Sequence, residues 1–82
     1  MTYKEKFDSE SDWRKKVLLV EFFHLLQLTK DPQWRVRDTA NVFKKSMGLI
    51  SEDLLLAQCL RDGKLDECVS RHKAIILLRK SK

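Results

Sequence analysis

The sequence predicts an all-α protein, a small helical bundle of about four helices that forms a single domain over residues 1–82. The chain contains only two glycines and one proline, which favours long uninterrupted elements. Apolar residues make up 43% of the sequence and charged residues 35%, a balance typical of a compact fold rather than a disordered chain. Apolar side chains recur at helical spacing between residues suited to capping helices. We therefore expect one modest core built from helices alone.

The N-terminal residues 1–10 alternate in charge and have little apolar periodicity, so we expect this end to be frayed. Tyr3 and Phe7 are nevertheless four positions apart, the spacing of neighbours on one helical turn. Ser11 or Asp12 then offers an N-cap for a strongly apolar helix over Trp13–Leu28.

On a helical wheel, most large apolar residues of the Trp13–Leu28 segment fall within one half-turn: Leu18, Leu19, Phe22, Phe23, Leu25 and Leu26. The opposite side gathers Lys16, Glu21, His24 and Gln27, with Val17, Val20 and Leu28 among them. So broad an apolar surface requires burial in the core or contact with a second copy of the chain. We expect burial, with a homodimer through this helix as the alternative. We expect His24 to be a half-buried surface residue rather than a catalyst.

A break follows at residues 29–33, because Pro32 has no amide hydrogen and disfavours helix at the residue before it. Trp34 is expected to wedge into the core. A helix from about Val36 to Lys44 should place Val36, Ala40 and Phe43 on its inner face.

A second helix should begin at Ser46, whose hydroxyl can cap it, and end at Arg61 before Gly63. Its inward residues are Ile50, Leu54 and Ala57, with a second apolar stripe at Leu49, Leu56 and Leu60. Residues 64–69 read as a connector, and residues 70–80 as a basic C-terminal helix capped by Ser70.

The formal charge is +5, and its surplus lies near the C-terminus, where residues 64–82 hold six Lys or Arg and two Asp or Glu. Such a surplus favours polyanionic partners. Four further basic residues flank the predicted turn between the two central helices: Arg35, Arg37, Lys44 and Lys45.

The two cysteines, Cys59 and Cys68, indicate reduced thiols in a cytoplasmic protein. No metal is expected, because Cys68 and His72 lack the paired short spacings of a tetrahedral site. No cofactor and no membrane association are expected either, since the longest apolar run is too short for a bilayer. The chain lacks a phosphate-binding glycine loop and a nucleophile with a neighbouring base, so we expect no enzyme.

A more specific pattern lies within residues 34–61, where Thr39-Ala40, Lys45-Ser46 and Ile50-Ser51 are followed by Leu54 and Leu56-Ala57. In this pattern Trp34 to Arg79 resembles the helix-turn-helix domain of ParB/KorB-like proteins, which partition and regulate bacterial and plasmid DNA, and related small phage proteins. The sequence departs from that family at Lys44, which stands where many relatives have the turn glycine. Either the turn closes differently or a lysine adopts the left-handed conformation.

The resemblance implies a dimeric DNA-binding regulator or partition-type factor that places the Ser46–Arg61 helix in the major groove of double-stranded DNA. The residues it would use on phosphates and base edges are Arg35, Arg37, Lys44, Lys45, Ser46, Met47, Gly48, Ser51 and Glu52. None of the groove-facing positions, which also include Leu55, is an Arg, Lys, Asn or Gln that could pair with a purine in two places. Glu52 and Asp53 would repel phosphates unless they are held away from them.

The alternative is a helical protein-interaction module, such as a phage-type inhibitor or adaptor of a host protein, built on the same scaffold without DNA binding. The apolar helix over Trp13–Leu28 and the mixed face of Met47, Glu52 and Leu55 favour it. The DNA-binding hypothesis requires that Ser46 starts a separate helix whose leading edge is open.

Overall fold

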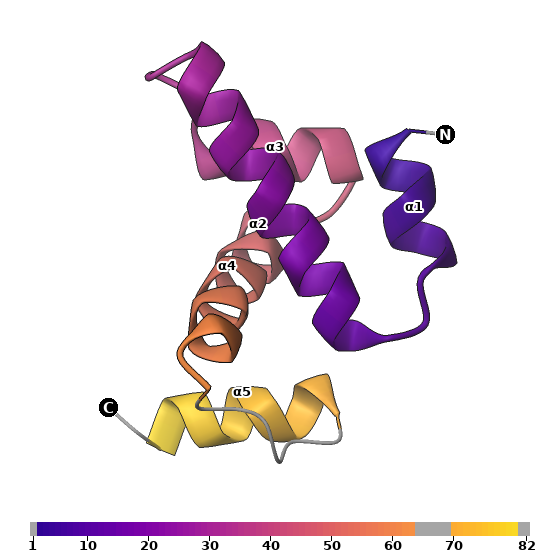
Figure 1. The fold of residues 1–82 in the computed structure, drawn as a ribbon, viewed down its shortest axis with the longest axis vertical. Helices are drawn as coiled ribbons and strands as arrows, with labels where there is room; N and C mark the ends of the chain where they lie inside the picture. The colour runs from indigo at the N-terminus through magenta and orange to yellow at the C-terminus, as the bar shows by residue number, and fades with distance from the viewer. Residues whose placement is uncertain (1, 64–69, 81–82) are drawn as a thin grey trace.

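The computed structural model describes residues 2–63 and 70–80. This part of the chain contains five helices and no strand: α1 Tyr3–Ser9, α2 Trp13–Lys30, α3 Val36–Phe43, α4 Met47–Arg61 and α5 Arg71–Lys80. The prediction of a small all-α bundle is confirmed. In Figure 1, α1 lies beside α2, α4 passes behind α2, and α5 lies below the other helices. The predicted connector over residues 64–69, with Cys68, lies outside the described residues.

Helix α1 corrects the prediction of a frayed N-terminus at residues 1–10. The Thr2 hydroxyl accepts a hydrogen bond from the Glu5 amide at 3.1 Å and so caps the helix. Phe7 is buried with its ring centroid 5.4 Å from that of Phe43, and the Tyr3 ring lies 4.9 Å from that of Phe23. Two aromatic side chains one turn apart suffice to dock this short helix, although its other residues are mostly polar.

Helix α2 begins where the sequence predicts and ends two residues later than predicted, at Lys30. The Asp12 carboxylate accepts from the Arg14 amide at 3.0 Å, so Asp12 rather than Ser11 is the N-cap. At the other end, the Asp31 amide still donates to the Gln27 carbonyl at 2.8 Å, just before Pro32.

The face of α2 that enters the core differs from the predicted one. The buried residues are Val17, Val20 and Phe23, two of which stand on the side of the wheel expected to be polar. Leu18, Phe22 and Leu25 are instead 38%, 57% and 48% exposed. Val17 and Val20 pack between α2 and its neighbours, and Phe23 packs edge-on against Phe43, with the ring centroids 5.4 Å apart. The face of α2 with the most apolar residues is therefore not the face that packs against the rest of the bundle.

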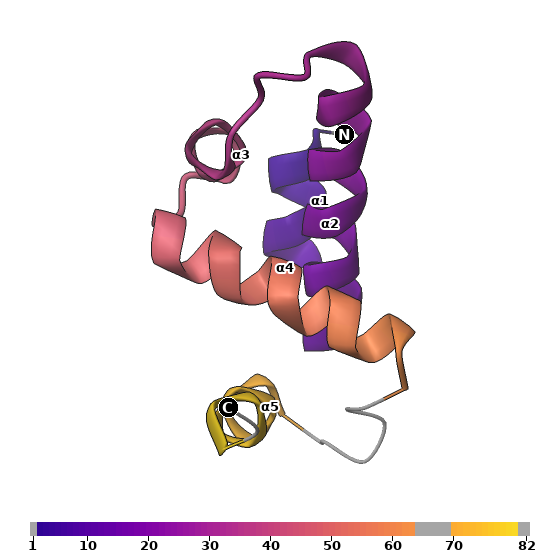
Figure 2. The same ribbon diagram turned by 90° about the vertical axis from the view of Figure 1, so that its left-hand side faces the viewer.

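The bundle contains two apolar clusters, both of which involve α2 and α4. The first, here called the upper cluster, joins α1, α2, α3 and the start of α4 through Phe7, Val20, Phe23, Ala40, Phe43 and Ile50. The second, the lower cluster, joins α2, the later half of α4 and α5 through Val17, Leu56, Ala57 and Ala74. Figure 2 shows α4 beginning beside α3, with α5 seen end-on below α4.

Candidate nucleic-acid interface

Helices α3 and α4 are separated by three residues, so the chain does not run as one unbroken rod through this region. Lys44 has φ 58° and ψ 44°, a left-handed conformation that ends α3. The Lys45 amide donates to the Ala40 carbonyl at 3.0 Å. The Ser46 hydroxyl accepts from the Leu49 amide at 3.2 Å, which makes Ser46 the predicted N-cap of α4. Of the two alternatives for the turn, a lysine in the left-handed conformation is the one observed.

The crossing of α3 and α4 depends on side chains that the sequence analysis placed in the core. Ala40, Phe43 and Ile50 are all buried. Val36 and Leu54 are half-buried and pack against the same cluster. The predicted inner faces of the two helices are therefore confirmed at these positions.

Behind α3, three polar groups form a small hydrogen-bonded network. The Trp34 indole donates to the buried hydroxyl of Thr39 at 2.7 Å, and the same oxygen lies 2.7 Å from Nδ1 of His24. Trp34 also makes an edge contact with Phe23, with the ring centroids 6.2 Å apart. Burial lowers the pKa of His24 below its ordinary value. Trp34 thus contacts the core, as the sequence predicts, and His24 is half-buried.

Most of the predicted interface residues are exposed. This holds for Arg35, Arg37, Lys44, Lys45, Ser46, Met47, Gly48 and Ser51. The residues from Lys44 to Ser51 are adjacent in the turn and the first turns of α4, whereas Arg35 and Arg37 lie at the opposite end of α3. Along α4, the exposed stripe continues through Leu55, which is 44% exposed. The leading edge of α4 is therefore open toward solvent, apart from Glu52.

Lys45 is exposed but engaged with α1. Its Nζ lies 4.0 Å from a carboxylate oxygen of Asp8 and 5.7 Å from the centroid of the Phe7 ring. Asp8 also pairs with Lys4, and this hydrogen bond holds the pKa of Asp8 below its ordinary value. Lys45 therefore points back toward α1, and its charge is partly offset by that of Asp8.

The two acidic residues of α4 are held by α5. Asp53 is 1% exposed, and its Oδ1 lies 2.9 Å from Nε and 2.8 Å from Nη2 of Arg71. Burial raises the pKa of Asp53, although the Arg71 guanidinium opposes the rise. Glu52 is half-buried, 3.9 Å from Arg71 and 3.6 Å from Arg79.

These ion pairs were not predicted from the sequence, in which Glu52 was assigned to the groove-facing side of α4. The available signal was the match between two adjacent acids in the central helix and the basic surplus of the C-terminal segment. A charge pattern alone does not reveal which face of α4 turns toward α5, so the partners had to come from the structure.

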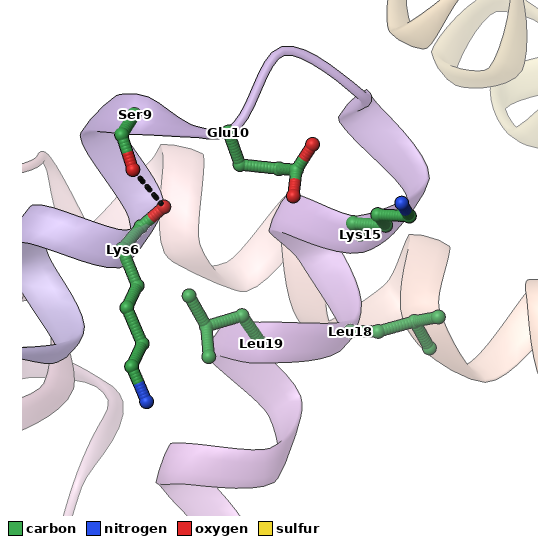
Figure 3. A pocket seen from close by; sticks show the side chains of 6 residues that line it. All are labelled: Lys6, Ser9, Glu10, Lys15, Leu18 and Leu19. Atoms are coloured by element: carbon green, nitrogen blue, oxygen red, sulfur yellow. Dashed lines mark hydrogen bonds between the residues drawn. The ribbon is translucent and has the colours of Figure 1, made fainter.

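A shallow groove of about 480 Å³ lies between α1 and α2, lined by Lys6, Ser9, Glu10, Lys15, Leu18 and Leu19. Figure 3 shows Glu10 above it and the two leucines along its floor, with Ser9 donating to the Lys6 carbonyl at 3.2 Å. Its two lysines and one glutamate leave a single positive charge, and its floor is apolar. The groove continues the exposed apolar face of α2 at Leu18 rather than forming a site for chemistry.

Comparison with family models, with curated proteins and with solved structures finds no match for this chain. Within residues 2–63 and 70–80, no helix combines the length and the apolar character needed to cross a bilayer. The same described residues contain no group of three His, Cys, Asp or Glu side chains arranged to hold a metal ion.

Proposed function

We propose that α3, the turn and α4 form a helix-turn-helix that binds double-stranded DNA, with α4 entering the major groove. The observation that carries this proposal is the open leading edge of α4. Ser46 starts the helix after a left-handed residue, and Met47, Gly48 and Ser51 are exposed immediately beyond it. A recognition helix contacts base edges with these same early positions.

The electrostatics of the surface support contact with phosphates. Arg35, Arg37 and Lys44 are exposed on α3 and the turn. The acids that would oppose a phosphate backbone, Glu52 and Asp53, are paired with arginines of α5. Because opposite charges at these distances largely cancel at longer range, Lys44 remains as the basic charge beside the start of α4, and Arg35 and Arg37 add positive charge at the other end of α3.

The chemistry of the edge favours binding through phosphates and DNA shape over reading of individual bases. Met47, Gly48 and Ser51 provide no side chain that pairs in two places with guanine or adenine. Phosphate contacts position a protein on the duplex without specifying sequence. We therefore propose that this domain is a regulator or partition-type factor that binds DNA with only a modest preference for particular base sequences.

The test compares Arg37→Gln/Lys44→Gly with the wild-type chain in DNA binding across a series of salt concentrations. The variant removes two outward charges, and glycine suits the conformation of residue 44. Each lost phosphate contact should lower the log–log salt slope by about 0.9, so we expect a decrease of about 1.8. Fluorescence anisotropy with a labelled random duplex measures both the affinity and the slope.

A matched control is Lys15→Gln/Lys30→Gln, which removes two exposed charges from α2 and leaves α3 and α4 untouched. This control should keep the salt slope of the wild-type chain. Its affinity for DNA should fall slightly, because the overall positive charge is lower. Equal slopes for the two double variants would refute docking through α3 and the turn. Absence of salt-sensitive binding in the wild-type chain would refute the proposal as a whole.

The exposed face of α2 favours a protein–protein contact through this helix. Leu18, Phe22 and Leu25 are spaced as one stripe and are exposed together. An exposed stripe of large apolar side chains marks an association surface more often than an ordinary solvated face. The partner we propose for this stripe is a second copy of the chain, which would also supply the dimer of a helix-turn-helix protein.

A further inference from the structure

A second, smaller hollow lies where α1, α2 and α4 meet the first residue of α5. Its volume is about 210 Å³, and the residues that matter for its chemistry are Phe7, Trp13, Lys16, Lys45, Asp53 and Arg71. We call it the four-helix hollow. Its other lining residues are Val17 and Leu49, so it adjoins the start of α4 but does not include the exposed residues Met47, Gly48 and Ser51.

One hydrogen-bond donor among the residues that line the four-helix hollow has no acceptor in the described part of the chain. It is Nε1 of Trp13, a buried atom. Arg71, by contrast, already engages Asp53, whose Oδ1 lies 2.9 Å from Nε and 2.8 Å from Nη2. A buried donor without a partner is unfavourable by about 1–3 kcal/mol, so an acceptor that reached Trp13 Nε1 would remove this cost.

The charges around the four-helix hollow leave a positive surplus. Lys16 and Lys45 place their ammonium groups 4.6 and 5.7 Å from the centroid of the same Phe7 ring. The carboxylates that face this region are Asp53, which is paired with Arg71, and Asp8, which is shared between Lys4 and, at 4.0 Å, Lys45. Two ammonium groups therefore remain incompletely balanced beside walls of low polarity, which strengthen their field.

We propose that the four-helix hollow binds a small doubly charged anion of the phosphate class, either inorganic phosphate or a short phosphate monoester. Such an anion offers several acceptor oxygens, enough for the Trp13 donor and for both lysines. The volume is about seven times the ~30 Å³ that one water occupies in the liquid, so it accommodates such a group with a short substituent. The inference does not depend on DNA binding.

The test is a phosphate titration of the full chain, followed by the indole N–H signals in ¹H–¹⁵N correlation spectra at constant ionic strength. The chain has two tryptophans, so Trp34 provides an internal reference. Its indole already donates to Thr39. We expect the Trp13 signal to shift and saturate while the Trp34 signal stays in place. A Trp34→Phe variant assigns the two signals.

The matched variants are Lys16→Gln and Lys30→Gln, both on α2, of which only the first lies at the hollow. Loss of a charge-assisted contact should weaken phosphate binding at least about tenfold in Lys16→Gln and leave Lys30→Gln unchanged. A parallel titration with glycerol 3-phosphate distinguishes the two sources. Tighter binding than inorganic phosphate assigns the site to monoesters, and equal or weaker binding assigns it to the free ion.

Three results would overturn the proposal. They are a Trp13 shift that grows linearly without saturation, a shift reproduced by sodium chloride at the same ionic strength, and equal phosphate affinity in Lys16→Gln and Lys30→Gln. None of these readouts involves DNA. Failure of DNA binding and failure of anion binding are therefore separable.

Discussion

Lys44 is the one residue other than glycine with positive φ among the described residues. A side chain in this conformation is unfavourable by about 1–2 kcal/mol, because Cβ crowds the following carbonyl oxygen. The surrounding structure maintains it through the Ser46 cap and the buried side chains on either side of the turn.

We expect Lys44→Gly to raise the free energy of unfolding by about 0.5–1 kcal/mol, since relief of crowding exceeds the entropy that glycine loses on folding. Urea denaturation followed by circular dichroism measures the change. Lys44→Ala keeps Cβ and serves as the control. A gain of the same size in Lys44→Ala would attribute the effect to charge and not to backbone conformation.

His24 gives the protein a dependence of stability on pH. Because burial lowers its pKa in the folded state, the unfolded chain takes up the proton first as the pH falls. Stability is therefore complete above the unfolded pKa of about 6.5 and decreases below it. We expect the free energy of unfolding to fall between pH 7 and 5.5, with a flatter profile in His24→Gln. An identical slope in the variant would exclude His24 as the source.

The contact between α4 and α5 includes the buried carboxylate of Asp53 and the guanidinium of Arg71. Arg71→Met would leave Asp53 without its cation, and we expect a loss of up to about 3 kcal/mol in stability. In the double variant Asp53→Leu/Arg71→Met both polar groups are gone, so most of that loss should be recovered. Urea denaturation measures the totals, and amide hydrogen exchange in α5 measures whether that helix detaches first.

The second single variant is Asp53→Leu. If the stability lost in the double variant equals the sum of the losses in Asp53→Leu and Arg71→Met, the pair contributes no coupling energy. Glu52→Gln is a suitable control, because Glu52 is half-buried and lies farther from Arg71 than Asp53 does. It should change stability by less than about 1 kcal/mol.

At the level of the elements, capping residues in the sequence predicted where the helices begin and end. The sequence predicted less well which face of each helix packs against its neighbours. Asp12, Ser46 and Ser70 each cap the helix after them, and Gly63 has the expected positive φ. These signals are local and can be read along the chain. The face of α2 depends on which neighbours can approach it, and α1 depends on Phe43 far along the sequence, so neither is a local property.

The same distinction applies to the candidate interface. The turn, its cap and the exposed positions of early α4 were predictable, because they follow from local geometry. The pairing of Glu52 and Asp53 with α5 was not, since it requires the relative placement of two helices separated by a connector.

Across the whole molecule, the exposed stripe of α2 provides a direct test of self-association. Phe22 is 57% exposed and its neighbour Phe23 is 6% exposed, so the two phenylalanines report on different roles. We expect the wild-type chain to sediment as a concentration-dependent dimer and Phe22→Gln/Leu25→Gln as a monomer. The free energy of unfolding of the monomer should change by less than about 1 kcal/mol. Sedimentation velocity together with urea denaturation measures both properties.

Phe23→Ala is the contrasting variant, because emptying a buried aromatic position should destabilise the fold by about 3–5 kcal/mol. A wild-type chain that sediments as a monomer at all concentrations would refute the second copy as the partner of this stripe.

The upper and lower clusters each contact one tryptophan, Trp34 in the first and Trp13 in the second. Emission from variants that retain a single indole would therefore follow the melting of each half of the bundle separately. Coincident transitions would mean that α2 and α4, which run through both halves, make unfolding a single cooperative event. A Trp13 transition at a lower temperature than that of Trp34 would mean that the half of the bundle that contains α5 unfolds first, while the other half stays folded.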